Sequence, residues 1–194
     1  MKPAGRPNRA ACFQKENRMY IWIGCQLPGS FEKELRSFCL AQNESLGLDT
    51  AAFALPQHIS LKISFDAGEE YEAVLDALED ILHREEKFYV NPLSLEVMGN
   101  ILWITFRENG TLRRLHGMLD EQLQQRFAIG QHPFDRDFRF HSTLYFGDTE
   151  RLGLACQRLA GFPIPEKLLV DTFLLGISPD GSPGSYRVVR QVKV

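Results

Sequence analysis

Residues 57–65 of this chain decide the fold and read Gln57-His58-Ile59-Ser60-Leu61-Lys62-Ile63-Ser64-Phe65. Apolar and polar residues alternate along this stretch, as they do in a strand with one buried face. We therefore expect the isoleucines and the leucine to face a core, and His58, Ser60 and Lys62 to share the opposite face. A histidine, a hydroxyl and a lysine on one face can bind a phosphate and move a proton beside it.

A second stretch repeats this pattern. Residues 140–146 read Phe140-His141-Ser142-Thr143-Leu144-Tyr145-Phe146. By position, His141, Thr143 and Tyr145 correspond to the histidine, the serine and the lysine of the first stretch. A hydrogen-bonded strand histidine without a function would explain either copy alone. The repetition favours a functional site built from both.

The flanking patterns predict a duplicated unit. Each half reads as strand, helix, histidine strand, helix and strand, and the second half adds one more strand. The histidines are 83 residues apart (141 − 58 = 83), and the opening strands at Met19 and Ile101 are 82 apart (101 − 19 = 82). A duplicated unit places equivalent strands around a pseudo-twofold axis, so we expect the two histidines to face each other over one groove.

The sequence therefore predicts an α+β fold that is bilobal, with two β-α-β-α-β units in pseudo-twofold symmetry around a central cleft. We expect residues 1–17 to be a flexible basic extension and residues 18–194 to form a single domain. Its repeats, about 18–98 and 99–194, would each form a lobe. The expected strands are Met19–Leu27, the two histidine stretches, Phe88–Met98, Ile101–Arg107, Leu168–Ile177 and Tyr186–Val194. The expected helices lie within 30–47, 71–82, 111–130 and 149–161.

Composition is that of an ordinary globular protein, with 44% apolar residues and a net charge of −3. This charge argues against a broad surface that coats nucleic acid.

The four cysteines form no C-x-x-C pair, so we expect reduced thiols and no zinc site. The chain has no run of 18 apolar residues and no signal-peptide pattern. We expect a cytoplasmic monomer with no membrane segment.

Two opposed histidines suit phosphodiester chemistry. Imidazoles with an ordinary pKa near ~6.5 can divide one reaction at neutral pH, one acting as general base and the other as general acid. The Ser60 and Thr143 hydroxyls can donate hydrogen bonds to the non-bridging phosphate oxygens. This design requires no metal. The sequence has no G-x-S-x-G elbow, no phosphate-binding glycine loop and no pair of helical histidines spaced for zinc.

The paired H-x-[ST]-x motifs resemble the two-histidine (2H) phosphoesterase superfamily, and especially its 2'-5' RNA ligase, or LigT-like, branch. Residues 58–62 are similar to that branch's first motif, H-[IV]-T-L-K, with serine in place of the commoner threonine, and residues 141–144 to its second. Residues 18–21 resemble its opening strand. Ser178 and residues 184–188 resemble its final hairpin. The likeness covers residues 18–194.

The resemblance implies catalytic roles for His58, Ser60, His141 and Thr143, with no metal and no organic cofactor. It also implies that RNA ends or small cyclic nucleotides with 2',3'-cyclic or 2'-5'-linked phosphodiesters are the substrates. We further hypothesise that three residues bind substrate. Lys62 would neutralise the phosphate, and Tyr145 or Tyr20 would stack on a base.

Together with the resemblance, the sequence thus predicts a metal-independent cyclic phosphodiesterase, and the resemblance leaves reversible 2'-5' RNA ligation open as a further activity. Two alternatives stay open. One is a module that binds a nucleotide such as AMP without turning it over. The other is a 3'-5' exonuclease or a 2'-5' oligoadenylate phosphodiesterase on the same fold.

Overall fold

The computed structural model describes residues 18–194, so the extension predicted at residues 1–17 lies outside the described residues. Its helices are α1 (Gly29–Asn43), α2 (Tyr71–Leu82), α3 (Gly110–Phe127) and α4 (Thr149–Leu159), and its short 3-10 helices are η1 (Ala51–Ala54), η2 (Gly68–Glu70) and η3 (Pro133–Asp135). Its strands are β1 (Tyr20–Gln26), β2 (His58–Ser60), β3 (Phe65–Asp66), β4 (Phe88–Val90), β5 (Pro92–Met98), β6 (Ile101–Phe106), β7 (His141–Phe146), β8 (Leu168–Val170), β9 (Thr172–Ser178) and β10 (Arg187–Lys193). None of the helices in residues 18–194 is long and apolar enough to cross a membrane.

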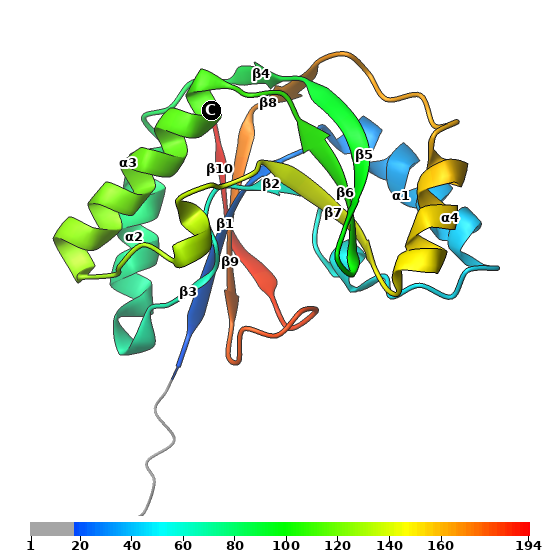
Figure 1. Ribbon diagram of the computed structural model, residues 1–194. Helices are drawn as coiled ribbons and strands as arrows, with labels where there is room; N and C mark the ends of the chain where they lie inside the picture. The colour runs from blue at the N-terminus through cyan, green and yellow to red at the C-terminus, as the bar shows by residue number, and fades with distance from the viewer. Residues whose placement is uncertain (1–17) are drawn as a thin grey trace, which may run out of the picture.

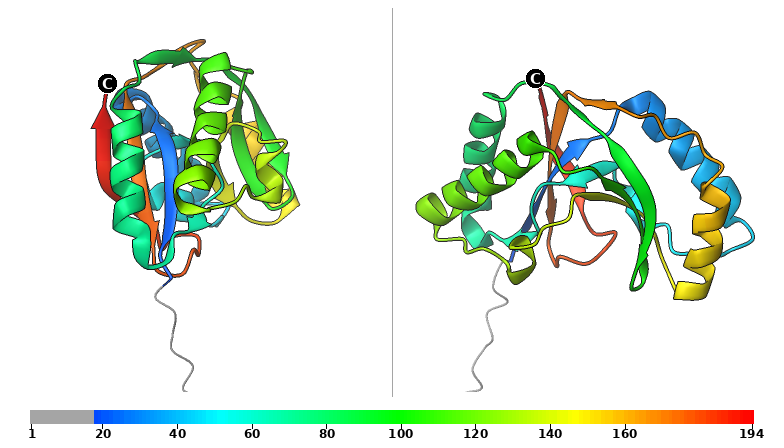
Figure 2. Two further views of the ribbon diagram at one scale, coloured as in Figure 1. Left: turned by 90° about the vertical axis from the view of Figure 1, so that its left-hand side faces the viewer. Right: turned by 45° about the horizontal axis from the view of Figure 1, so that its top comes forward.

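Two sheets form two lobes (Figure 1). One sheet has the strand order β10-β9-β1-β2, with β3 also paired to β1, and the other has the order β5-β6-β7. The small β4-β8 pair lies between them. Helices α2 and α3 lie together on one side of the molecule, and α1 and α4 lie together on the other (Figure 2). The predicted bilobal α+β fold is confirmed.

The two halves of the chain exchange elements, so the lobes do not coincide with residues 18–98 and 99–194. Strand β9 comes from the second half but pairs with β1 from Tyr20↔Ser178 to Cys25↔Phe173. Helix α1 comes from the first half but packs on α4 and the loop after it, where the Phe38 and Phe162 ring centroids lie 5.2 Å apart. Each lobe therefore needs both halves, and neither repeat buries its own core alone.

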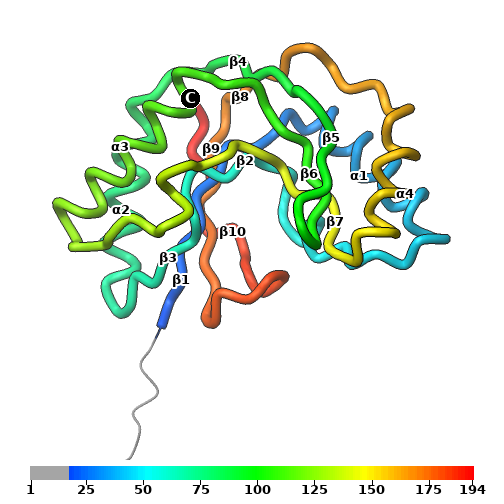
Figure 3. The backbone as a smooth tube through the Cα atoms, viewed as in Figure 1, coloured from blue at the N-terminus to red at the C-terminus, as the bar shows by residue number. Residues whose placement is uncertain are grey.

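The first histidine strand is much shorter than predicted. Strand β2 stops at Ser60, the chain bends, and β3 begins only at Phe65 (Figure 3). The Asp135 carboxylate stabilises the bend. It accepts hydrogen bonds from the Ile63 amide at 3.1 Å and from the Lys62 ammonium at 2.8 Å. The alternation that would have put Lys62 on the same face as His58 ends before it reaches Lys62.

A buried hydrogen bond joins the two histidine strands. The Ser142 hydroxyl donates to the Gln57 side-chain oxygen at 2.9 Å, and each residue is 1% exposed. Gln57 immediately precedes His58, and Ser142 immediately follows His141. This contact therefore holds β2 against β7 at the point where both histidines arise.

We predict that Ser142→Ala lowers the free energy of unfolding by about 1–3 kcal/mol, because it leaves the buried Gln57 oxygen without its donor. Urea denaturation measures this change. Ser37, exposed on α1, offers a matched control. Ser37→Ala should change the free energy by no more than about 0.5 kcal/mol. Equal effects of the two substitutions would contradict the structural role of the contact.

Candidate active site

His58 lies at the start of β2 with one ring nitrogen already engaged. Its Nδ1 lies 2.7 Å from the Pro56 carbonyl, so Nδ1 carries the proton and donates, and Nε2 keeps a free lone pair. The Trp22 indole meets the ring edge-on at a centroid distance of 4.1 Å. Burial lowers the pKa of His58 to about 4, against the raising effect of the Pro56 hydrogen bond, and the charge of His141 lowers it further. The His58 imidazole is therefore uncharged at neutral pH and can accept a proton.

His141 at the start of β7 is held in the same way. Its Nδ1 lies 2.7 Å from the Arg139 carbonyl, which again is two residues earlier in the chain. The Trp103 indole stacks on the ring at a centroid distance of 3.8 Å and an interplanar angle of 17°. Burial lowers the pKa of His141, the Arg139 carbonyl raises it, and the Arg139 charge lowers it. Within residues 18–194, the Nε2 of neither histidine has a hydrogen-bond partner.

The Trp22 indole occupies a space that two glycines leave open. A Cβ at Gly24 would lie 2.7 Å from the indole and 3.2 Å from the His58 ring, and a Cβ at Gly176 would also lie 2.7 Å from the indole. The indole Nε1 donates to the Ser60 hydroxyl at 3.2 Å. Because Ser60 accepts this bond, its own proton remains available to an oxygen in the site.

The second half lacks this indole-to-hydroxyl bond. The Trp103 Nε1 is buried and is the one buried side-chain nitrogen or oxygen in residues 18–194 without a hydrogen-bond partner. Thr143, which pairs with Trp103 across β6 and β7, therefore receives no hydrogen bond from it. The two halves share the histidine geometry but differ in how the hydroxyl is held.

A cavity of about 170 Å³ brings the predicted residues of both halves together. His58, Ser60 and Thr143 line it, together with Trp22 and Tyr186. The other lining residues are Ala51, Ala52, Leu55, Phe146, Pro183 and Gly184. His141 lies outside this lining but close enough for its charge to lower the pKa of His58. We call this space the histidine cavity.

Two of the predicted substrate-binding residues are buried elsewhere, and those predictions are wrong. Lys62 is 2% exposed, and the Asp120 and Asp135 carboxylates both bind its ammonium. Tyr145 is 0% exposed, and its hydroxyl donates to the Cys39 carbonyl at 2.6 Å. Neither side chain can contact a substrate in the histidine cavity.

A β-bulge explains the position of Tyr145. The register between β6 and β7 shifts, so that Leu102 pairs with Tyr145 and Trp103 pairs with Thr143. The extra residue, Leu144, reverses the alternation, and both Leu144 and Tyr145 are buried. Phe146 takes the cavity-facing place instead.

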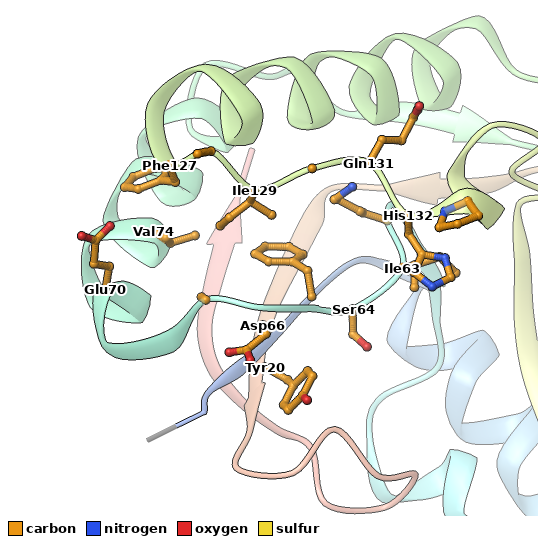
Figure 4. A pocket seen from close by; sticks show the side chains of 16 residues that line it. Tyr20, Ile63, Ser64, Asp66, Glu70, Val74, Phe127, Ile129, Gln131 and His132 are labelled. Atoms are coloured by element: carbon orange, nitrogen blue, oxygen red, sulfur yellow. The ribbon is translucent and has the colours of Figure 1, made fainter. Parts of the chain in front are cut away.

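Tyr20, the third predicted substrate-binding residue, does not line the histidine cavity. It lines a larger neighbouring cavity with Ser64 and Asp66 (Figure 4). Its ring packs against Gly181, with 3.1 Å between the ring and the position that a Cβ there would take. The structure therefore separates Tyr20 from His58 and Thr143.

Sequence patterns missed three aromatic residues of the site: Trp22, Trp103 and Tyr186. Trp22 and Trp103 pack on the histidines from neighbouring strands, and Tyr186 reaches the histidine cavity from the loop before β10. An aromatic residue in a strand is by itself no sign of a site. Only the strand pairing shows which ring each indole contacts.

No group of three or more histidine, cysteine, aspartate or glutamate side chains is arranged to hold a metal ion within residues 18–194. In that part of the chain Cys25, Cys39 and Cys156 carry free thiols, and burial raises the pKa of each. These cysteines are packing residues of the core and its edge.

Solved structures share this fold. A crystal structure of a phosphoesterase is 19% identical, with a TM-score of 0.60, and the match covers 91% of this chain and 98% of that chain. The structure of Escherichia coli LigT with 3'-AMP is 17% identical, with a TM-score of 0.57, and the match covers 92% and 98%. The Thermus thermophilus protein TT0787 is 18% identical, with a TM-score of 0.60, and the match covers 90% and 97%. No curated protein sequence matches the chain.

The sequence itself matches a family model. The model of the 2'-5' RNA ligase superfamily matches residues 9–178, which include both histidine strands. This match agrees with the resemblance carried by the two histidine motifs. The chain belongs to the 2'-5' RNA ligase superfamily.

Proposed function

We propose that this protein is a cyclic phosphodiesterase that hydrolyses 2',3'-cyclic phosphates of RNA ends or small nucleotides. The observation that carries the proposal is the matched geometry of two histidines, each with Nδ1 bound to a carbonyl and Nε2 free. Each histidine also has a hydroxyl residue two places further along its strand, Ser60 or Thr143, on the wall of one cavity. The 3'-AMP bound to the similar LigT structure supports a nucleotide ligand.

The reaction needs one base and one acid on opposite sides of phosphorus. His58 Nε2 accepts a proton from water as the water oxygen forms a bond to phosphorus. The bond between phosphorus and the 3'-oxygen of the ribose breaks, and His141 Nε2 gives its proton to that oxygen. The products are a 2'-phosphate monoester and a 3'-hydroxyl. Ser60 and Thr143 donate hydrogen bonds to the non-bridging oxygens, where negative charge increases.

The pKa values support this division of roles. The acid must hold a proton when the base does not, so the histidine with the lower pKa suits the role of base. Burial and the charge of His141 lower the pKa of His58 to about 4. Burial and the charge of Arg139 also lower the pKa of His141. We therefore take His58 as base and His141 as acid.

We predict that His58→Ala and His141→Ala each lower kcat on a 2',3'-cyclic nucleotide by about 10²–10⁴-fold, because each removes one proton-transfer group. Mass spectrometry of the products measures the rate. The exposed His83 offers a matched control, and His83→Ala should leave kcat unchanged. A chelator should also leave the rate unchanged. Full activity in either active-site variant, or loss of activity with a chelator, would contradict the mechanism.

The pH profile provides a second prediction. Activity should rise as His58 loses its proton near pH 4. It should fall as His141 loses its proton, at a pH below the ordinary value of about 6.5. We therefore expect kcat/KM to follow a bell-shaped curve with its maximum on the acid side of neutrality. A rate that keeps rising through pH 8 would show that the proton donor is another group.

We predict that Gly24→Ala lowers kcat by about 10²-fold, because the new Cβ displaces the Trp22 indole and the His58 ring. Displacement into solvent should also raise the pKa of His58 toward its ordinary value, which shifts the acid limb of the profile to higher pH. Gly117 is the matched control, since nothing lies within 4 Å of the Cβ it would gain. An unshifted acid limb in the Gly24 variant would show that Gly24 does not position His58.

A further inference from the structure

A second and larger cavity is lined by Tyr20, Ser64 and Asp66 (Figure 4). Its volume is about 760 Å³, against about 170 Å³ for the histidine cavity. One wall is Tyr20 and residues 63–67, a second is the start of α2, and the third is residues 127–133 after α3. We call this space the acidic cavity because Asp66 and Glu70 line it.

The two cavities meet at the loop before β10. Tyr186 lines the histidine cavity, its hydroxyl donates to the Gly181 carbonyl at 3.4 Å, and Ser64 on the wall of the acidic cavity lies close enough to affect the pKa of Tyr186. The loop before β10 also faces both spaces. Gly184 lines the histidine cavity, while Gly181 packs against the Tyr20 ring on the other side. A ligand that extends past Tyr186 and Ser64 therefore passes from one cavity into the other.

A buried carboxylate ties the walls of the acidic cavity together. Asp135 is 1% exposed and accepts hydrogen bonds from the Ile63 amide at 3.1 Å and the His132 amide at 2.9 Å. Ile63 and His132 lie on two different walls. The cavity is thus preformed by a contact that does not depend on a ligand.

The two cavities differ in volume, and this difference limits which part of a substrate each can bind. Pockets for small ligands typically have a volume of about 300–1,000 Å³. The histidine cavity, at about 170 Å³, is smaller than that range, whereas the acidic cavity, at about 760 Å³, lies within it. The histidine cavity therefore suits the reacting phosphate and its sugar, and the rest of a longer substrate needs further space.

The charge of the acidic cavity selects against phosphate. Asp66 and Glu70 are both exposed, and Asp66 has a partial counter-ion in Arg18 at 3.7 Å. The cation among the described lining residues is Lys62, and two carboxylates already bind it. Carboxylates accept hydrogen bonds from hydroxyl and amino groups and repel anions.

The remaining lining residues suit a nucleoside. Rings come from Tyr20 and His132, and apolar surface comes from Ile63, Val74 and Ile129. Rings and apolar side chains bind the faces of bases, and carboxylates bind ribose hydroxyls and base amino groups. An uncharged nucleoside fits this chemistry, and a phosphate group does not.

We propose that the acidic cavity is a subsite for the nucleoside that adjoins the reacting nucleotide, and that this nucleoside carries a free 5'-hydroxyl. The proposal rests on the proposed function, since it extends the substrate of the same site. The preferred substrate is then a dinucleotide that ends in a 2',3'-cyclic phosphate and begins with a 5'-hydroxyl. A cyclic mononucleotide places its phosphate and sugar in the histidine cavity and leaves the acidic cavity empty.

The first test compares the dinucleotide with the cyclic mononucleotide of adenosine. We expect kcat/KM to be about tenfold higher for the dinucleotide, the effect of one stacked base. Ala67→Trp fills the acidic cavity and should remove this advantage while leaving the mononucleotide unchanged. The exposed Ala73 on α2 lies outside the cavity lining, so Ala73→Trp is the matched control and should preserve the advantage. Equal losses on both substrates, or no loss on either, in the Ala67 variant would overturn the proposal.

The second test uses charge and does not add bulk. A 5'-phosphate on the dinucleotide should lower kcat/KM about fivefold, which corresponds to about 1 kcal/mol of repulsion at the surface. The double variant Asp66→Asn, Glu70→Gln keeps the shape of the cavity and should abolish that penalty. An unchanged penalty in this variant would overturn the proposal even if the Ala67 variant does not fold.

Binding distinguishes failure of the subsite from failure of the proposed function. If the wild-type protein turns over neither substrate, the proposed function is wrong. The dinucleotide with a 2'-monophosphate end then still tests the subsite by titration calorimetry. Weaker binding to the Ala67 variant than to the Ala73 variant supports the subsite, and equal binding overturns it.

Discussion

The buried hydrogen bond between Gln57 and Ser142 is the contact on which the site depends. Strand β2 pairs with β1 in one sheet, and β7 pairs with β6 in the other. No pairing among the described strands joins the two sheets through β2 and β7. The side-chain hydrogen bond between Gln57 and Ser142 joins these strands directly beside the two histidines, and a backbone bridge between Asp49 and Phe146 also links β7 to the segment that leads into β2. The site exists only when both lobes are folded and docked.

Pseudo-twofold symmetry gives the two histidines equivalent positions, and local differences give them different surroundings. Each Nδ1 donates to the carbonyl two residues earlier, which leaves the same nitrogen, Nε2, free in both halves. The surroundings then differ. Trp22 meets His58 edge-on and binds Ser60, whereas Trp103 stacks flat on His141 and leaves its Nε1 without a partner. A symmetric scaffold thus places the two histidines in different surroundings, which is the asymmetry that the proposed acid-base mechanism uses.

Much of the fold could be predicted because its signals are local or repeated. The helices follow from apolar spacing, and the pairing of His58 with His141 follows from two copies of one short pattern. The predictions that were wrong concern residues whose positions depend on contacts between distant segments. A bend held by Asp135 moved Lys62 away from the site, and one bulge at Leu144 buried Tyr145. The exchange of β9 between halves and the approach of Tyr186 also depend on strand pairing that no single stretch of sequence encodes.

The two-histidine site is tested most directly by the protonation of the two imidazoles, observed by ¹⁵N NMR with and without a nucleoside 2'-monophosphate. We expect both free rings to carry their proton on Nδ1 at neutral pH. We also expect the bound phosphate to shift the Nε2 signals of both His58 and His141, because in the proposed mechanism the two rings flank one phosphorus atom. A proton on Nε2 in the free rings, or a shift in the signals of only one histidine, would contradict the proposed two-histidine site.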